Sequence, residues 1–345
     1  MKANLKDGLS GLMRVKNEER FIEPCIDSCI DSLDELIIVY NDCTDETPDI
    51  VERMHRKYSG KIKVYAYNNQ VLSHNLTEDE FEYACNLPED SSRLHSNQCN
   101  FALSQVDYKY AVKIDVDQLY FADELKQWRD VCSGENKVKW KVGFIVGWLF
   151  MLYLSIYRRL SAKAGKPLLG MFPDRLVKLC ISSYTDLAKW RLQRGKIAIA
   201  LSGYNVFKDD KWYIPFDGYN VHPPYNGEGD TLIFRVSDET YFVKSINNSN
   251  KTVTERFVCP YKMMFAGPIW FHLHANRESC WGKVKKIEEK YPELFVPVEK
   301  FSEMSYEEVH DKLNKKTHTL YQRILFALVH KMGYDRILKH LSLLK

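Results

Sequence analysis

The first 120 residues alternate between short apolar runs and stretches in which apolar residues recur at helical spacing. The short runs predict strands at Gly8–Val15, Glu35–Tyr40, Lys61–Tyr67 and Tyr110–Asp117. The helical spacing between them predicts helices at Asn17–Ser32, Pro48–Tyr58 and Ser92–Gln105. This β-α-β-α-β-α-β order favours a mostly parallel central sheet with helices on both faces.

Polar and charged segments follow three of these predicted strands. They read RVKNEE (14–19), YNDCTDET (40–47) and DVD (115–117). The carboxyl ends of parallel strands meet at one edge of a sheet, and open α/β sheets bind their ligands at that edge. The sequence therefore predicts that these three segments lie together at a binding site.

The last of these segments carries two carboxylates. If the strand continues through it, Asp115 and Asp117 project from the same face and repel each other unless a cation lies between them. Mg²⁺ and Mn²⁺ prefer oxygen ligands, and Mg²⁺ is usually held by one or two carboxylates together with substrate phosphates. The pair therefore indicates a metal-bound diphosphate. The alternative is a solvated loop, where such pairs are common.

Composition and charge narrow the class of protein. The 345 residues are 45% hydrophobic and 13% aromatic, which is enough for one large or two ordinary globular domains. A net charge of +3, without a basic block in the first two-thirds, does not indicate a nucleic-acid groove. Nine cysteines at irregular spacings, with no paired CxxC, argue against a disulfide framework or a structural zinc site. With no signal-peptide-like apolar core near residue 1, we expect a cytoplasmic protein with reduced thiols.

The middle of the chain carries a long apolar segment, Val142–Leu154, with basic residues on both sides. It is shorter than the roughly 20 residues that span a bilayer. We expect a buried helix, and the alternative is an interfacial segment or a lid over the acceptor.

Two later segments suggest binding surfaces. Residues 201–271 predict short strands rich in aromatic side chains, which suit the apolar faces of sugar rings; an ordinary aromatic core is the alternative. Residues 320–345 combine apolar residues at helical spacing with five Lys or Arg and one acid. This predicts a basic amphipathic helix on anionic lipid. The alternative is a terminal helix packed on its own domain.

Three motifs, MRVKNEE (13–19), IIVYNDCTDETPDIV (37–51) and KIDVDQLY (113–120), resemble the nucleotide-sugar domain of GT-A glycosyltransferases. They are most similar to those of bacterial lipooligosaccharide β-1,4-N-acetylgalactosaminyltransferases, and later similarity is confined to short segments such as GDTL (229–232) and FHLH (271–274). The resemblance implies an α/β GT-A (Rossmann-like) fold with an acceptor-binding extension and C-terminal helices. It implies inverting, single-displacement transfer of N-acetylgalactosamine or a related sugar from a UDP-sugar to a glycan, assisted by Mn²⁺ or Mg²⁺.

On this basis we divide the chain into four parts. We expect a nucleotide-sugar-binding half at 1–130, a helical insert acting as a lid or membrane-facing segment at 131–200, an acceptor-binding half at 201–319, and the basic helix at 320–345. The expected acceptor is lipid-linked and belongs to lipooligosaccharide, lipopolysaccharide or capsule synthesis. The expected location is peripheral, on the cytoplasmic face of the inner membrane.

The resemblance assigns donor binding to polar side chains of the first half. The candidates are Arg14, Asn17, Glu18, Asn41, Arg93, Asn100 and Asp115. The first three would serve the uracil and ribose, although Asn and Glu also favour a plain helix N-terminus. Asn41 stands where many relatives carry an uracil-binding Asp, and its amide can both donate and accept. Arg93 and Asn100 would steady the diphosphate and ribose, with a solvated arginine as the alternative for Arg93.

The same resemblance suggests metal ligands. Asp117 would carry most of the contact with the ion, and Asp115 would lie nearer the ribose. His272 and His274 share a face if they belong to a strand, and they are candidates for a further ligand. The alternative is that they are ordinary structural histidines.

An inverting enzyme also needs a base that takes the proton of the acceptor hydroxyl. Asp230, at the entry to an apolar strand, is the first candidate and Glu228 is the second; ordinary turn chemistry is the alternative. Two other classes of protein use similar features. A metal-dependent nucleotidyltransferase or phosphohydrolase could carry the two aspartates but would be expected to add a glycine-rich phosphate loop or more acidic ligands. A non-catalytic sugar-binding protein could retain the fold.

Overall fold

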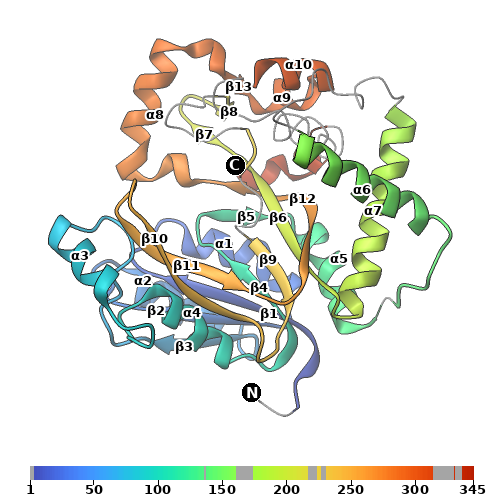
Figure 1. Ribbon diagram of the computed structural model, residues 1–345. Helices are drawn as coiled ribbons and strands as arrows, with labels where there is room; N and C mark the ends of the chain where they lie inside the picture. Colours follow the sequence, from blue (N-terminus) through green and yellow to red (C-terminus); the bar gives the residue numbers. More distant parts are fainter. Residues whose placement is uncertain are drawn as a thin grey trace.

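A central sheet organises the computed structural model, which describes residues 4–135, 137–160, 174–216, 224–226, 231–313, 330 and 336–345. In this part of the chain the sheet has eight strands in the order β3-β2-β1-β4-β9-β6-β12-β5 (Figure 1). Strands β3, β2, β1 and β4 are parallel, whereas β9 and β5 run antiparallel to their neighbours. The sheet is therefore mixed but mostly parallel, as predicted.

The first half follows the predicted order of elements. It consists of β1 (Lys6–Val15), α1 (Ile22–Cys29), β2 (Glu35–Tyr40), α2 (Thr47–Lys57), β3 (Ile62–Ala66), α3 (Glu78–Asn86), α4 (His95–Ser104) and β4 (Tyr108–Ile114). Only α3 was not predicted. Its start carries a capping box in which the Thr77 side chain accepts from the Glu80 amide and Glu80 bonds back to Thr77.

Two apolar layers hold the sheet between its helices. On one face Leu36 and Ile38 of β2 join a large cluster with residues of α1, α2 and α5 (Ala122–Ser133). On the other face Ile37 and Val39 pack with α4 and with a hairpin of β10 (Tyr241–Asn247) and β11 (Thr252–Val258). Because both faces are covered, β2 reads as the continuous apolar run ELIIVY.

The second half of the chain adds strands to the same sheet. They are β5 (Gln118–Tyr120), β6 (Ile197–Asn205), β9 (Thr231–Arg235) and β12 (Lys262–His272). The predicted boundary at residue 200 falls inside β6, which pairs with β12 and β9 in the centre of the sheet. The two predicted halves therefore share one sheet.

The remaining described elements surround the far edge of the sheet. They are β7 (Phe207–Lys208), β8 (Trp212–Pro215), α8 (Glu278–Lys290), β13 (Phe295–Pro297), α9 (Val298–Glu303) and α10 (Tyr306–Lys312). Beside them in Figure 1, α6 (Phe144–Leu160) crosses α7 (Asp174–Gln193) at the right-hand edge. The predicted helix at 142–154 is present, but only one of its faces is buried. None of the described helices is long and apolar enough to cross a membrane.

The last ten residues pack on the start of α5. Ile337 and Leu344 are buried, Arg336 pairs with Glu124 at 3.1 Å, and Lys339 pairs with Asp123. Asp123 and Glu124 lie in the first turn of α5, where the helix dipole favours acidic side chains. Two of the basic residues of the predicted lipid-binding helix (320–345) are thus engaged within the fold, and residues 320–329 and 331–335 of that helix lie outside the described residues.

Candidate active site

Asp117 lies at the junction of two distant segments of the chain. β4 ends at Ile114, a turn carries Asp117, and β5 then pairs with the last residues of β12, so that Gln118 faces His272. This pairing brings the FHLH motif to Asp117, and the backbone amide of Leu273 donates to the Asp117 carbonyl at 2.7 Å. The local sequence at each segment does not specify this contact, which depends on the register of the sheet.

Two histidines and an arginine surround the buried Asp117 carboxylate. His272 Nε2 lies 3.5 Å from Oδ1, His274 Nδ1 lies 3.3 Å from Oδ2, and Arg277 Nε donates to Oδ2 at 3.0 Å. Burial alone would raise the pKa of Asp117, but these positive and hydrogen-bonding partners outweigh it and hold the pKa well below its usual range. Asp117 is therefore a carboxylate at neutral pH.

The chemistry of this cluster fits a divalent metal ion. Ligand atoms of Asp117, His272 and His274 all lie within 4.8 Å of one another. His272 Nδ1 contacts Asn205 Oδ1 at 2.7 Å, and a proton on Nδ1 would leave Nε2, on the side of Asp117, as the nitrogen that coordinates an ion. Fixing a histidine tautomer through its outer nitrogen is the usual arrangement around protein metal ions.

Arg277 connects the cluster to the loop after β1. The Nη2 group donates to Glu18 Oε1 at 2.8 Å while Nε holds Asp117, and both carboxylates raise the pKa of the guanidinium against the effect of burial. Burial raises the pKa of Glu18, although Arg277 works in the opposite direction. Glu18 therefore lies next to the metal-ligand cluster, and Arg277 provides a permanent positive charge there.

Asp115 does not join this cluster in the described part of the chain, and the strand argument that placed it beside Asp117 was wrong. Because β4 ends before Asp115, the alternation of a strand does not apply to the two aspartates. Asp115 instead accepts from Arg14 at 3.0 Å and lies 3.5 Å from Lys113. The two carboxylates thus have separate sets of charged partners.

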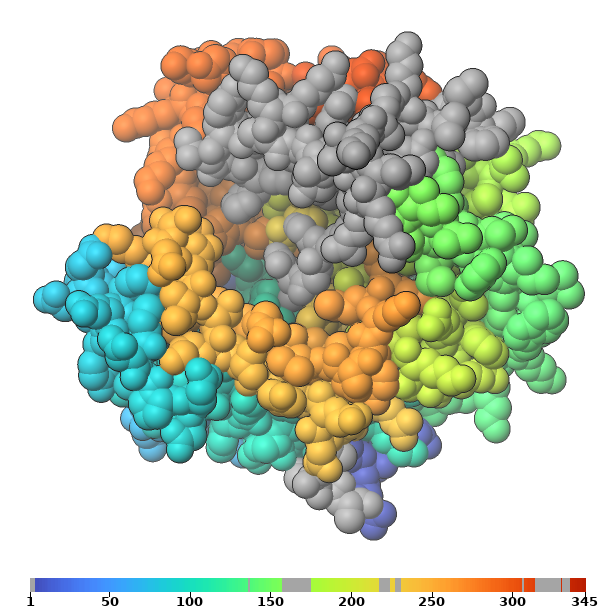
Figure 2. All heavy atoms as spheres, viewed as in Figure 1, coloured from blue at the N-terminus to red at the C-terminus, as the bar shows by residue number. Residues whose placement is uncertain are grey.

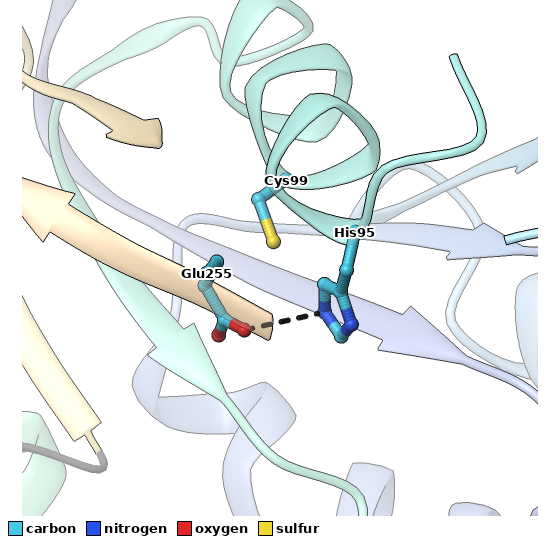
Figure 3. Close-up of side chains that lie close together, drawn as sticks. All are labelled: His95, Cys99 and Glu255. Carbon is cyan, nitrogen blue, oxygen red and sulfur yellow. Dashed lines mark ion pairs between the residues drawn. The ribbon is translucent and has the colours of Figure 1, made fainter. Parts of the chain in front are cut away.

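Arg14 and Lys113 also approach a carboxylate on the hairpin. Glu255 of β11 lies 3.2 Å from Lys113 Nζ and 3.9 Å from Arg14 Nη2. Figure 3 shows Glu255 pointing from β11 toward His95 and Cys99 of α4, and its Oε2 lies 3.7 Å from His95 Nε2. The two cations and two carboxylates form a compact, charge-balanced network between β1, β4 and the hairpin.

The group of His95, Cys99 and Glu255 also has metal-ligand spacing, but its carboxylate has other charged partners. Burial raises the pKa of the Cys99 thiol to about 12. The Glu255 carboxylate already compensates Arg14 and Lys113. We therefore treat this group as part of the structural charge network.

His95 should make the stability of the protein depend on pH. Burial lowers its pKa to about 4, whereas an unfolded histidine titrates near 6.5, so the unfolded chain binds more protons between these values. Stability is therefore lost as the pH falls through this window, by about 2 kcal/mol at pH 5.

We expect His95→Gln to reduce the loss of stability between pH 7.5 and pH 5 by about 2 kcal/mol, measured by urea unfolding at both values. His55→Gln, on the half-buried outer side of α2, serves as the control. An unchanged difference between the two pH values in His95→Gln would contradict the assignment.

The predicted donor residues have different surroundings. The Arg14 side chain is buried, and within the described part of the chain its Nε and Nη1 have no hydrogen-bond partner; the same holds for the Nδ2 of buried Asn41. Asn41 Oδ1 accepts from Gln98 of α4 at 2.8 Å, and Arg14 lies beside Cys99 of the same helix. Buried donors without partners are costly, so these groups are candidates to bind a ligand.

Other predicted donor residues are already engaged in the fold. The Asn17 side chain, on a residue with φ of 53°, exchanges hydrogen bonds with Thr44 at 2.8 and 3.1 Å. Asn100 does the same with the backbone of Phe242, both at 2.8 Å, and so fixes the hairpin to α4. Arg93 donates to Gln70 at 2.7 Å and to Tyr83 at 3.2 Å. The two candidate bases, Glu228 and Asp230, lie outside the described residues.

Sequence reasoning missed two charged residues of this region. Arg277 lies three residues after the FHLH motif in the sequence. This short distance from a candidate metal ligand could have indicated that Arg277 belongs to the site. Glu255 lies in the strand TVTERFV, whose sequence gives no sign that the hairpin folds over α4. Figure 2 shows that the surface is hollowed between this hairpin and α8.

Comparison with known proteins agrees with the topology. Residues 10–77 match the family described as glycosyl transferase family 2, a segment that runs from β1 to the residue capping α3. Comparison with curated proteins found no significant match. The matched segment forms the first part of the mixed, mostly parallel sheet, and this α/β architecture agrees with the predicted GT-A (Rossmann-like) fold.

Similarities to solved structures are looser. Residues 1–349 of *S. aureus* TarS are 12% identical over 78% of this chain and 61% of that chain, with a TM-score of 0.33. *Mycobacterium tuberculosis* glucosyl-3-phosphoglycerate synthase, in complex with Mn²⁺, UDP-glucose and phosphoglyceric acid, is 20% identical over 45% of this chain and 51% of that chain, with a TM-score of 0.26. The chain thus spans less than two-thirds of either protein, and at these TM-scores we assign no residue from them.

Proposed function

We propose that the protein is an inverting glycosyltransferase that moves a sugar from a UDP-sugar to a glycan acceptor. The observation that carries this proposal is the cluster of Asp117, His272 and His274 at the carboxyl edge of a GT-A sheet. The family match over residues 10–77 supports it. A metal-ligand set at this edge is the feature that a nucleotide diphosphate requires.

The donor set favours Mn²⁺ over Mg²⁺ as the bound ion. Mg²⁺ prefers oxygen ligands in octahedral geometry, whereas two imidazole nitrogens beside one carboxylate suit a softer ion. When bound, the ion neutralises negative charge that develops on the departing UDP. Arg277, held between Asp117 and Glu18, adds positive charge of fixed orientation at the same place.

Arg14 and Asn41 are our candidates for recognition of the uracil. Among the residues that the structure describes, their buried donors have no partner, and uracil presents two carbonyl oxygens that accept hydrogen bonds. Asp115, held by Arg14 and Lys113, would lie on the ribose side. Asp230 is our candidate for the base that removes the proton of the acceptor hydroxyl, which then attacks the anomeric carbon as UDP leaves.

The finer parts of the proposal follow from the sequence resemblance. We propose N-acetylgalactosamine or a related sugar as the group transferred, and a lipid-linked glycan of lipooligosaccharide, lipopolysaccharide or capsule synthesis as the acceptor. We further propose peripheral association with the cytoplasmic face of the inner membrane. Truncation before residue 320 is a poor test of that association, because Ile337 and Leu344 are part of the core.

Incubation with a panel of UDP-sugars, with and without Mn²⁺, tests the reaction. We expect UDP release that requires both the ion and a glycan acceptor. Release of a nucleotide product without any acceptor would indicate a phosphohydrolase, and pyrophosphate exchange with UTP a nucleotidyltransferase. Saturable sugar binding without turnover would indicate a non-catalytic sugar-binding protein.

A further inference from the structure

Helix α6 has a second apolar face that the fold leaves exposed. Five side chains at helical spacing, together with Val142 two residues before the helix, are between 42% and 70% exposed; the six residues are Val142, Ile145, Trp148, Leu149, Leu152 and Ile156. We call these six residues the α6 stripe. Exposed apolar surface of this length and regularity usually marks an interaction site.

The opposite face of α6 is locked against α7, so the helix cannot turn the stripe inward. Phe144 and Phe150 are buried, and Phe150 packs edge-on against Tyr184 with ring centroids 5.8 Å apart. At Gly147 the two backbones approach so closely that a Cβ would lie 2.4 Å from the Ser183 carbonyl oxygen. The exposed stripe is therefore a fixed property of the folded protein.

The sequence of α6 and of the residues that flank it is rich in positive charge. Residues 137–160 contain five basic residues and no acid; they are Lys137, Lys139, Lys141, Arg158 and Arg159. Helix α7 adds exposed Arg175 beside exposed Leu176 and Leu179. Asp186 of α7, 3.7 Å from Lys141, offsets part of this charge.

We infer that the α6 stripe docks on an anionic lipid surface, with the helix lying in the plane of the interface. Apolar residues on one side and lysines at the flank fit the acyl boundary and the lipid headgroups, and exposed Trp140 and Trp148 suit the interfacial region. Face-to-face contact between two copies would instead bring like charges together. The inference rests on the proposed membrane association and assigns it to α6 rather than to the C-terminal residues.

Vesicle sedimentation tests this surface. We expect the full-length protein to bind phosphatidylglycerol-containing vesicles at low salt, to bind neutral phosphatidylcholine vesicles less, and to lose affinity as salt screens the lysines. The triple variant Ile145→Ser, Trp148→Ser, Leu152→Ser should bind anionic vesicles at least about tenfold more weakly. Its matched control is Tyr241→Ser, Ile246→Ser, Met263→Ser, three similarly exposed apolar residues elsewhere, which should bind like the wild type.

Two results would overturn the inference. The first is a vesicle result: the wild-type protein does not bind anionic vesicles at low salt, or the triple variant binds them as well as the wild type does. The second is a dimer of the wild-type protein in sedimentation velocity that is absent in the triple variant, since the stripe would then join two copies. Turnover of UDP-sugar with a water-soluble acceptor should be equal in wild type and triple variant. Vesicle binding without any such turnover would support the inferred lipid-docking surface and contradict the proposed reaction.

Discussion

Asp117→Asn should eliminate metal-dependent turnover, with a loss of about a hundredfold to ten-thousandfold in kcat. The amide keeps the shape of the side chain but removes the charge on which His272, His274 and Arg277 converge. A metal ion that stabilises a leaving group contributes several kcal/mol, and each 1.36 kcal/mol corresponds to a factor of ten in rate. Mn²⁺ binding, measured by titration calorimetry, should weaken in parallel.

The variant should remain folded. Arg277 keeps its hydrogen bond to Glu18, so its positive charge loses only one of its two carboxylate partners. We therefore expect the free energy of unfolding, measured in urea, to fall by about 1–3 kcal/mol. Asp123→Asn is the matched control, because Asp123 also pairs with a histidine and a cation but lies at the start of α5. The control should lose stability and keep turnover and Mn²⁺ affinity. Near-normal turnover of Asp117→Asn with Mn²⁺ would refute the metal assignment.

Most of the first half of the fold could be predicted because its strands carry strong local signals. The run ELIIVY is buried on both faces and was predicted with its observed ends. Helix α2 begins where Thr47 and Pro48 indicate a helix start. The prediction missed α3, although the capping box formed by Thr77 and Glu80 at its start is a local signal of a helix.

The arrangement of the second half could not be predicted in the same way. Strand β9 enters between β4 and β6, and β5 pairs with β12 about 150 residues later in the chain, so both placements depend on contacts between distant segments. The burial of only one face of α6 likewise depends on a contact with a distant segment of the chain. Its sequence is apolar on nearly all sides, and only the packing on α7 decides which side is covered.

The candidate site shows the same division between local and distant information. The FHLH histidines and Asp117 could be named from their residue types together with the family resemblance, and the sheet register brought them together. The strand argument for Asp115 failed because a strand's length cannot be read from alternation that continues into a turn. Glu255 could not be found, since its role depends on where the hairpin packs.

The start of β9 gives a geometric reason to test Asp230 as the base. β9 runs antiparallel to β4, with Val112 opposite Ile233, so Thr231 enters the sheet at the carboxyl edge of β4. Thr231 is buried, and its hydroxyl donates to Oε1 of Gln118 at 3.1 Å. Gln118 directly follows Asp117 in the sequence. Asp230 immediately precedes Thr231 in the sequence and is thus the acid nearest along the chain to this edge in the second half.

Asp230→Asn should therefore lower kcat by about a hundredfold to ten-thousandfold, the usual contribution of a general base, with little change in the Kd for UDP-sugar or Mn²⁺. The pH dependence separates this role from a structural one. Turnover of the wild type should fall at acid pH as the base is protonated, and the variant's residual rate should lose that acidic limb. Glu228→Gln is the matched control and should retain most activity. Loss of donor binding in Asp230→Asn, or an unchanged pH profile, would show that another group removes the proton.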